Sequence, residues 1–312
     1  MAGRDVLLNY VLKAQAIEPI APVSRAYLHN VMVIVKLKQD AAAGVYECTT
    51  KAEVQAYTDS MAYVMLDNGM TKIYICAVEQ YSAAQALLDA SDYKYFTIIT
   101  DPAFTDTPTA INGFNGVSIW ETTVENTAKE YAGIATANNT AFISASPATG
   151  ENMYAATAIL LSGLTWRNHQ YAAMPAAGAT SDLGKAESYF ENRLSFVLNS
   201  PEFGNRLAFF VNRGRAIIAP YIYEEFTLDL QGWALTYINM NQPDYNNVEA
   251  AKLQSYLLNK AAEKYIDTGL VTALTISIAA DQDNFIMSGN IAIAEPKATW
   301  RIKATIQQGG LE

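Results

Sequence analysis

Short, nearly uncharged apolar runs alternate with helical segments through the first half of the chain. They include KIYICAV at Lys72–Val78, YFTIIT at Tyr95–Thr100 and AFISA at Ala141–Ala145. A strand without a polar face must be buried on both sides, as in parallel sheets whose crossover helices cover both faces. The pattern therefore predicts an α/β fold with a doubly wound, mostly parallel sheet that extends to about Met174.

The other elements of this layer follow from the same periodicity. Further strands are expected at Arg25–Lys38 and at Gln170–Met174. Helices are expected at Thr49–Asn68, Ser82–Ala90, Glu121–Asn138 and Glu151–Leu164. Thr50 and Glu53 have the spacing of a capping box at the start of the first helix, and Asn68–Gly69 is suited to end it.

The pattern changes after Pro175–Ser181, a run of small residues suited to a linker. The remainder predicts a helix, a hairpin, two helices and a final set of strands, which together form an α+β domain. The elements are Asp182–Leu198, the hairpin strands Leu207–Val211 and Arg215–Ile222, the helices Leu228–Met240 and Val248–Asp267 (closed by Gly269), and the strands Val271–Ala279, Gly289–Ala294 and Thr299–Ile306. We therefore expect an N-terminal arm at 1–22, an α/β domain at 23–175, and an α+β domain at 182–312. The last of these ends in an extended C-terminal arm from about residue 297.

Charge and composition exclude several classes of protein. The 312 residues carry a net charge of −10, and neither half has a basic excess, so we expect no nucleic-acid partner. No apolar run reaches the roughly 18 residues of a membrane-spanning helix, and the N-terminal residues do not have the pattern of a signal peptide, so we expect no membrane anchor. Cys48 and Cys76 have no metal or redox spacing and are expected to be packing residues.

Motifs for catalysis are missing from the sequence. It contains no G-x-G-x-x-G after a strand, no P-loop and no G-x-S-x-G elbow. Its two histidines, His29 and His169, have no histidine or cysteine nearby, and a catalytic or metal-binding role needs such partners. We predict no catalytic residues, no metal and no cofactor.

Two loops at strand ends could still bind a ligand. Ile143–Gly150 joins a strand to a helix, a layout that can present backbone amides to an anion. It contains no lysine, so a plain connector is the favoured interpretation. Asp101–Pro102 follows a strand, at the edge of the sheet where ligands bind in such folds. The same pair commonly starts a turn, and we expect a turn.

Basic residues gather at two places in this acidic chain. Arg206, Arg213 and Arg215 surround the predicted hairpin. Lys252, Lys260 and Lys264 lie within about 120° of one another on a helical wheel. Such groups usually form a solvated face, although in an assembly a basic stripe can meet an acidic partner.

The last predicted strand is the most suggestive feature. Its alternating residues would face two ways, with Trp300, Ile302, Ala304 and Ile306 on one side and Thr299, Arg301, Lys303 and Thr305 on the other. Such a strand can pair inside its own sheet, or it can join the sheet of a neighbouring molecule. Arms at both ends of a chain without a visible active site favour a role in assembly.

Three stretches resemble the contractile tail sheath proteins of bacteriophages and related injection machines. In Cys48–Val78 a helix, an Asn-Gly turn and an apolar strand follow one another. Ala84–Phe104 contains a strand that ends in Asp-Pro, and Gly269–Ile306 is similar to the strand pair and arm of the sheath C-terminus. The three stretches cover about half of the chain.

The resemblance implies a structural subunit and not an enzyme. Sheath subunits stack as rings around a tail tube and contract to drive it through the host envelope, and terminal arms link neighbours by strand exchange. It implies a helical homo-oligomer in the virion, assembled in the host cytoplasm, with the tail tube, baseplate and tail terminator proteins as partners. The arms would be residues 1–22 and Thr299–Ile306, and we take Lys252, Lys260 and Lys264 as a candidate tube contact. The chain is short for the family, which indicates a minimal sheath or a sheath-like protein of an unusual tail.

Two other functions remain open on the sequence. One is a small-molecule-binding α/β protein or enzyme that uses the carboxyl ends of Tyr95–Thr100 and Ala141–Ala145. The other is a different tail or baseplate component, which would form closed rings and no extended polymer.

Overall fold

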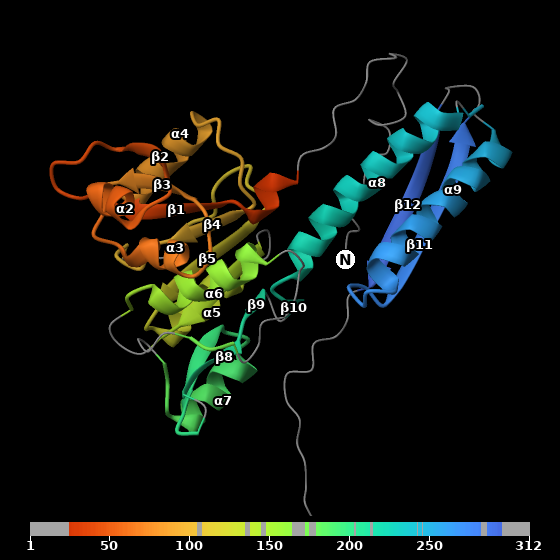
Figure 1. Ribbon diagram of the computed structural model, residues 1–312. Coiled ribbons are helices and arrows are strands. Elements are labelled where there is room, and N and C mark those ends of the chain that lie inside the picture. The colour runs from red at the N-terminus through yellow and green to blue at the C-terminus, as the bar shows by residue number, and fades with distance from the viewer. Residues whose placement is uncertain are drawn as a thin grey trace, which may run out of the picture.

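The apolar runs of the first half of the chain meet in one six-stranded sheet (Figure 1). The strand order is β2-β3-β1-β4-β5-β6, and all neighbours are parallel except β2 and β3. The strands are β1 (Val31–Lys36), β2 (Gly44–Cys48), β3 (Ile73–Val78), β4 (Thr97–Thr100), β5 (Val117–Thr122) and β6 (Asn138–Ile143). The prediction of a mostly parallel α/β sheet is confirmed.

The computed structural model describes residues 25–104, 108–134, 138–144, 148–163, 172–174, 179–202, 204–212, 215–241, 243–244, 246–281 and 286–294. Both predicted arms, residues 1–22 and Thr299–Ile306, lie outside the described residues. So do His169, Arg213 and most of the predicted linker. Within the described residues, none of the helices combines the length and hydropathy that a membrane-spanning helix requires.

Helices cover both faces of the sheet, since alternate side chains of each buried strand point to opposite faces. On one face, Val33 and Ile75 belong to the same core cluster as Met65 and Tyr154 of the covering helices. The helices on that face are α2 (Lys51–Tyr57), α3 (Val64–Asp67) and α6 (Glu151–Ser162), with the short 3-10 turns η1 (Ala26–His29) and η2 (Met61–Tyr63). The other face is covered by η3 (Tyr81–Ala83), α4 (Ala84–Asp89) and α5 (Glu125–Ala132).

In the described part of the second half, the chain forms three small antiparallel sheets and the helices α7, α8 and α9. In chain order the elements are α7 (Leu183–Glu191), β7 (Phe196–Ser200), β8 (Gly204–Phe209), β9 (Val211–Asn212), β10 (Arg215–Ala216), α8 (Ala219–Asn241), α9 (Asn247–Ala261), the π-helix η4 (Ala262–Ile266), β11 (Ala273–Asp281) and β12 (Ile286–Ala294). The pairs are β7 with β8, β9 with β10, and β11 with β12.

The long helix α8 connects the large sheet to the α9–β11–β12 unit (Figure 1). Near its start, Tyr221 is fully buried and shares a hydrogen bond of 2.6 Å with Thr97 of β4. The Tyr221 ring also meets Phe96 edge-on, with 5.2 Å between the ring centroids. Further along, Tyr237 packs against Tyr256 of α9. The helix is therefore part of both packing units.

The capping box and the glycines that the sequence placed at helix ends are confirmed. Thr50 and Glu53 form the predicted capping box, with each side chain bonded to the other's backbone. Gly69 and Gly269 have φ values of +101° and +75°, in the left-handed region that glycine tolerates at the end of a helix.

The predicted helix Thr49–Asn68 is interrupted, which corrects the sequence analysis. Thr58 leaves the helix because its hydroxyl donates to the Lys36 carbonyl oxygen of β1 at 2.8 Å, and Ser60 then caps a new turn. The strand predicted at Arg25–Lys38 begins only at Val31, since the four residues before Asn30 form η1. The edge strand β2 was not predicted.

Two other predicted helices also have wrong ends. The prediction Glu121–Asn138 is too long at both ends, because α5 spans only Glu125–Ala132 and Asn138 is the first residue of β6. The segment assigned to the start of Glu121–Asn138 is the end of β5, where Glu121 is buried by contacts with a distant loop. Asp182–Leu198 stops as a helix at Glu191, and Arg193 takes a positive φ of 58°. The chain can then turn so that Ser195 pairs with the outer edge of β6.

The predicted hairpin around residues 212–214 exists, but its strands are only two residues long. The strand predicted at Arg215–Ile222 ends at Ala216, and α8 begins at Ala219, well before the predicted start at Leu228. Pro220 is compatible with this start, because residues in the first turn of a helix donate no intrahelical hydrogen bond and the N–H that proline lacks is not required there. The strand predicted at Leu207–Val211 pairs mainly with β7.

Two glycines offer a matched test of this packing. A Cβ atom at Gly116 would lie 2.1 Å from the Phe96 backbone oxygen, which accepts the hydrogen bond from Val117 that joins β4 to β5. Gly232 lies within α8 with nothing within 4 Å of such an atom. We expect Gly116→Ala to lower the free energy of unfolding by about 2–3 kcal/mol. Gly232→Ala should raise it by about 0.5–1 kcal/mol. Urea denaturation measures both, and equal effects would contradict this packing.

Candidate functional site

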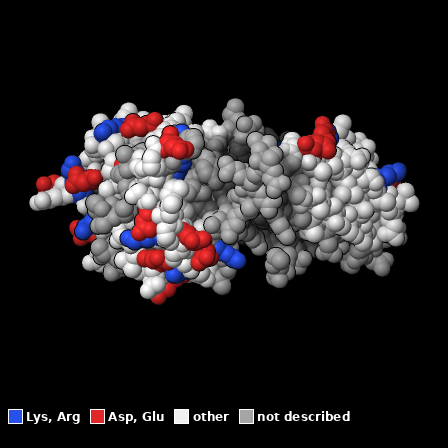
Figure 2. Space-filling view, turned by 90° about the horizontal axis from the view of Figure 1, so that it is seen from below, with Lys and Arg blue, Asp and Glu red and all other residues white. Residues whose placement is uncertain are grey.

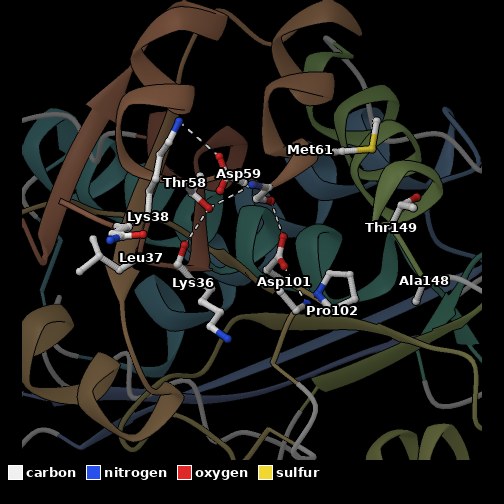
Figure 3. A pocket seen from close by; sticks show the side chains of 13 residues that line it. Lys36, Leu37, Lys38, Thr58, Asp59, Met61, Asp101, Pro102, Ala148 and Thr149 are labelled. Carbon is white, nitrogen blue, oxygen red and sulfur yellow. Dashed lines mark hydrogen bonds and ion pairs between the residues drawn. The ribbon is translucent and has the colours of Figure 1, made fainter. Parts of the chain in front are cut away.

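A pocket of about 440 Å³ opens at the carboxyl ends of β1 and β4 (Figure 3). β1 lies between β3 and β4 in the sheet. The chain first builds outward from β1 to β3 and then crosses to β4 on the other side of β1, so the winding of the sheet reverses at this point. Ligands of open α/β sheets bind at such points. The polar residues around the pocket include Lys36, Lys38, Thr58, Asp59, Ser60, Asp101 and Thr149.

The acidic groups of this pocket are paired within the protein. Asp101 is buried, and its carboxylate accepts hydrogen bonds from Ser60, from Tyr154 at 2.6 Å and from the Ala103 amide at 2.8 Å. The bond from the Ala103 amide closes the turn that is expected at Asp101–Pro102 from the sequence. Burial and then the Asp101 charge raise the pKa of Tyr154 well above its ordinary value of 10.0. At the mouth, Lys38 pairs with Asp59 at 3.3 Å.

The strand-to-helix loop binds a carboxylate of the protein itself. Glu121 accepts from the Ser144 hydroxyl at 2.9 Å and from the amides of Gly150 and Met153 at 3.1 and 3.3 Å. Burial raises the pKa of Glu121 above its ordinary value of 4.5, although these bonds act to lower it. The amides at the start of α6 are therefore used by an internal anion, in agreement with the connector interpretation.

The histidine and cysteine residues that the structure describes occupy structural positions. His29 Nδ1 lies 2.9 Å from the Leu161 carbonyl oxygen. Cys48 and Cys76 are free thiols buried in β2 and β3, and burial raises their pKa values to about 11 and about 12. Among the described residues, no group of three or more His, Cys, Asp or Glu side chains could hold a metal ion.

A buried charge cluster lies instead at the middle of α8. Asp229 is 1% exposed, and its carboxylate accepts hydrogen bonds from Arg25, from Lys264 at 2.6 Å and from the Tyr265 hydroxyl at 2.5 Å. Lys264 also pairs with Glu225 at 2.5 Å. Burial raises the pKa of Tyr265 above its ordinary value, and the hydrogen bond to Asp229 raises it further. The cluster joins the segment before β1 to α8 and to the π-helix that follows α9.

A second bond supports the same junction. The Tyr27 hydroxyl donates to Glu224 of α8 at 2.7 Å, and burial with this bond raises the pKa of Tyr27. Arg25 and Tyr27 are among the first residues that the structure describes. The chain that follows the predicted N-terminal arm is therefore fixed to α8 through two side chains.

The three predicted stripe lysines have different environments. Lys252 is exposed and pairs with Glu249 at 2.7 Å, and Lys260 is exposed and lies 3.7 Å from Glu263. Lys264 belongs to the Asp229 cluster. Two of the three ammonium groups therefore face solvent, and the third is directed at α8.

The predicted arginine group is only partly described. Arg206 lies within β8, where it pairs with Leu198 of β7. Arg215 starts β10, and Arg213 is outside the described residues. The sequence analysis did not single out Glu121 or Asp229. Glu121 directly follows the apolar pair Ile119–Trp120, and Asp229 lies between Leu228 and Leu230. An acidic residue next to such apolar residues is a signal that could have identified both.

The fold is shared with chains of a known assembly. A doubly wound sheet joined by a long helix to a helix-and-hairpin unit matches chains from a prophage sheath and baseplate, so the resemblance to tail sheath proteins is confirmed at the level of the fold. No protein-family model and no curated protein sequence matches the chain.

Three similar solved structures come from the anti-feeding prophage. A chain of its six-fold symmetrised baseplate has a TM-score of 0.62 and 9% identity, covering 92% of this chain and 94% of that one. A chain of its helical sheath in the contracted state has a TM-score of 0.59 and 10% identity, with 95% and 97% covered. A chain of its contracted baseplate has a TM-score of 0.58 and 10% identity, with 94% and 96% covered.

The Asp229 cluster can be tested by removing its central charge. Asp229→Ala removes the buried acceptor shared by Arg25, Lys264 and the Tyr265 hydroxyl and leaves Glu225 as the remaining carboxylate beside the two cations, so we expect the free energy of unfolding to fall by about 3 kcal/mol. The control Glu263→Ala removes the exposed partner of Lys260 and should change it by less than about 0.5 kcal/mol. Urea denaturation at neutral pH gives both values. A loss for Asp229→Ala no larger than that of the control would contradict a stabilising role.

Proposed function

We propose that the chain is a structural subunit of a contractile tail sheath. In this proposal it polymerises as a helical stack of rings around a tail tube and contracts to drive the tube through the envelope of a target cell. The observation that carries the proposal is the extent of the fold similarity. It includes a helical sheath chain and covers at least 92% of this chain, so both packing units and the helix between them take part.

The physical properties of the described residues suit this role. A contracting assembly needs rigid subunits, surfaces that can exchange partners, and tethers that persist. Buried hydrogen-bonded carboxylates at Asp101, Glu121 and Asp229 favour a rigid body. Figure 2 shows charges of both signs interspersed over the visible side of the α/β part, with no large area of one sign. Such a surface allows modest polar contacts that can be exchanged.

The tethers would be the two predicted arms. Residues 1–22 would precede the α/β domain at 23–175, and Thr299–Ile306 would follow the strands of the α+β domain at 182–312. Each arm would add a strand to the sheet of a neighbouring subunit, where main-chain hydrogen bonds supply affinity. The Arg25 and Tyr27 contacts would hold the base of the N-terminal arm against α8.

The proposed tube contact is the exposed side of α9, through Lys252 and Lys260. Each lysine has an exposed ion pair with a glutamate of its own chain, and such a pair contributes about 0–1 kcal/mol. An acidic tube surface could therefore replace these glutamates at small cost. Lys264 would act indirectly, by holding the end of the helix against α8.

The remaining partners follow from the same proposal. The subunit would contact baseplate and tail terminator proteins at the two ends of the sheath, would reside in the virion tail, and would assemble in the host cytoplasm. We propose a role without catalysis, cofactor, nucleic acid or membrane anchor. The internal pairing of the pocket carboxylates, the amides at the start of α6 and the acidic net charge support this view.

A baseplate subunit is the second candidate, because two of the solved structures named above are chains of baseplate assemblies. The two candidates differ in the form of the assembly. A sheath subunit polymerises without a fixed end, whereas a baseplate component forms closed rings.

Negative-stain electron microscopy of the purified, overexpressed protein distinguishes these candidates. We expect long hollow tubes, and removal of residues 298–312 should abolish them because the arm strand is lost. Removal of residues 307–312 alone leaves Thr299–Ile306 intact and should preserve the tubes. Closed rings, or tubes that persist without residues 298–312, would contradict the proposal of arm-linked sheath subunits.

The tube contact is tested by reversing the two exposed lysines. Lys252→Glu with Lys260→Glu should abolish co-sedimentation with the tail tube, because the variant presents four acidic groups where it had two ion pairs. Lys185→Glu, on exposed α7 of the other packing unit, should leave co-sedimentation unchanged. If the double variant co-sediments as well as the wild type, α9 is not the tube contact.

A further inference from the structure

A groove with mostly apolar walls lies between the end of α8 and the start of α9. The two helices pack side by side, and the ring centroids of Tyr237 and Tyr256 are 5.2 Å apart. The groove has a volume of about 710 Å³ and is lined by Tyr237, Asn247, Val248, Ala251, Lys252 and Ser255. Lys252 supplies the charge of this lining.

Two large apolar side chains at this groove are exposed. Val248 is 64% exposed, and Met240, which follows Tyr237 by three residues on the same side of α8, is 78% exposed. Among the described residues, the other exposed large apolar side chains lie in the α/β part and on α7, and they are Tyr93, Val124 and Leu183. Exposed apolar side chains gathered at an apolar groove are typical of a surface that binds another segment.

The N-terminal sequence contains a segment that needs such a surface. Residues 5–15 (DVLLNYVLKAQ) carry polar side chains at Asp5, Asn9 and Lys13, and every residue between these three is apolar. A spacing of four places the polar residues on one stripe of a helix, with Leu7 and Val11 on the opposite side. Such a helix is stabilised when its wide apolar side is covered. The segment lies outside the described residues.

The described start of the chain brings this segment near the groove. Arg25 is fixed to Asp229 at the middle of α8, and Met240 lies eleven residues further along the same helix, a distance of about 16 Å. Residues 16–24 join the segment to Arg25, and nine extended residues span up to about 30 Å. Pro19 and Pro22 favour an extended chain. The connection is therefore long enough to reach the groove of the same molecule.

We propose that the groove between α8 and α9 binds residues 5–15 of the same chain, as a helix, in the subunit that has not assembled. The side with Leu7 and Val11 would cover Val248 and Met240. The same chain is the source because a short connection gives an effective concentration of about a millimolar, which a second copy in dilute solution does not reach.

Docking would connect the N-terminal arm to the proposed tube contact. Lys252 lines the groove and also belongs to that contact. A docked segment and a tail tube would therefore compete for the same side of α9, so that the arm is released where the tube binds. This competition rests on the proposed function, whereas the docking itself does not.

Amide hydrogen exchange of the unassembled full-length protein tests the docking. We expect slow exchange at residues 5–15, and exchange about tenfold faster in Val248→Asp, because a carboxylate in an apolar contact loses water without gaining a partner. Aspartate is favourable in the first turn of a helix, so α9 should still form. The control Val124→Asp changes an exposed valine next to α5 and should have no effect. Unprotected residues 5–15 in the wild type, or equal exchange in Val248→Asp, would overturn the proposal.

A cross-link identifies the source of the segment. One chain carries Leu7→Cys together with Ala251→Cys, an exposed position in the groove, and the natural thiols are buried. With a short bismaleimide we expect a product within one chain, which Val248→Asp should abolish. The control pair Leu7→Cys with Leu183→Cys, on α7, should give none. A product only between two chains would assign the groove to a second copy and overturn the proposal, as would the lack of any product.

Removal of residues 1–15 separates the docking from the proposed function. We expect a larger fraction of the shortened chain than of the full chain to co-sediment with the tail tube, because the competing segment is gone. An equal or smaller fraction would overturn the competition. If neither chain binds the tube, the tube contact is refuted, while hydrogen exchange and the cross-link still decide the docking.

Discussion

A buried carboxylate, Asp229, lies at the centre of the polar contacts that join the two packing units of the chain. It lies at the middle of α8, where it binds Arg25 from the segment before the large sheet and Lys264 and Tyr265 from the π-helix that follows α9. An ionised carboxylate is strongly destabilising in a protein interior unless several donors compensate for the lost water. These three donors must therefore stay in place together, and they fix the orientation of α8 relative to both units.

The other buried carboxylates have the same effect within the sheet. Glu121 fastens the end of β5 to the start of α6, and Asp101 fastens the end of β4 to Ser60 and Tyr154. The edge of the sheet where α/β enzymes place their reactive groups thus contains acids that already have partners. This arrangement favours a rigid body that can transmit force. It supports the proposed structural role, in which the functional contacts are those between subunits.

The sequence predicts the parts of this fold that depend on local patterns. Uncharged apolar runs place β3, β4 and β6 to within about three residues, and the capping box of Thr50 and Glu53 marks the start of α2 correctly. The errors occur where a distant contact decides the conformation. The helix ends at Thr58, whose hydroxyl donates to a backbone carbonyl of β1. Glu121 can lie in a buried strand because Ser144 and the amides at the start of α6 donate hydrogen bonds to its carboxylate. Such contacts between segments far apart in sequence leave no periodic signal.

The candidate site shows the same division. The stripe of Lys252, Lys260 and Lys264 is regular on a helical wheel, but the π-helix after Ala261 and the acidic residues of α8 give Lys264 a separate environment. The Ile278 backbone N–H of β11 donates to Gln254 Oε1 of α9 at 2.9 Å. This hydrogen bond depends on the packing of α9 against β11, which a single sequence cannot specify. The alternating pattern of Thr299–Ile306, in contrast, is legible directly from the residues and leads to the proposal of assembly.

The most direct test of this account is a helical reconstruction, by electron cryomicroscopy, of the polymer that the protein forms. The account predicts subunits whose α/β unit, α8 and hairpin keep the arrangement described above, with subunits linked by a strand that can be traced from one copy into the sheet of another. A closed ring, or a polymer in which every hairpin has only its own two strands, would contradict it.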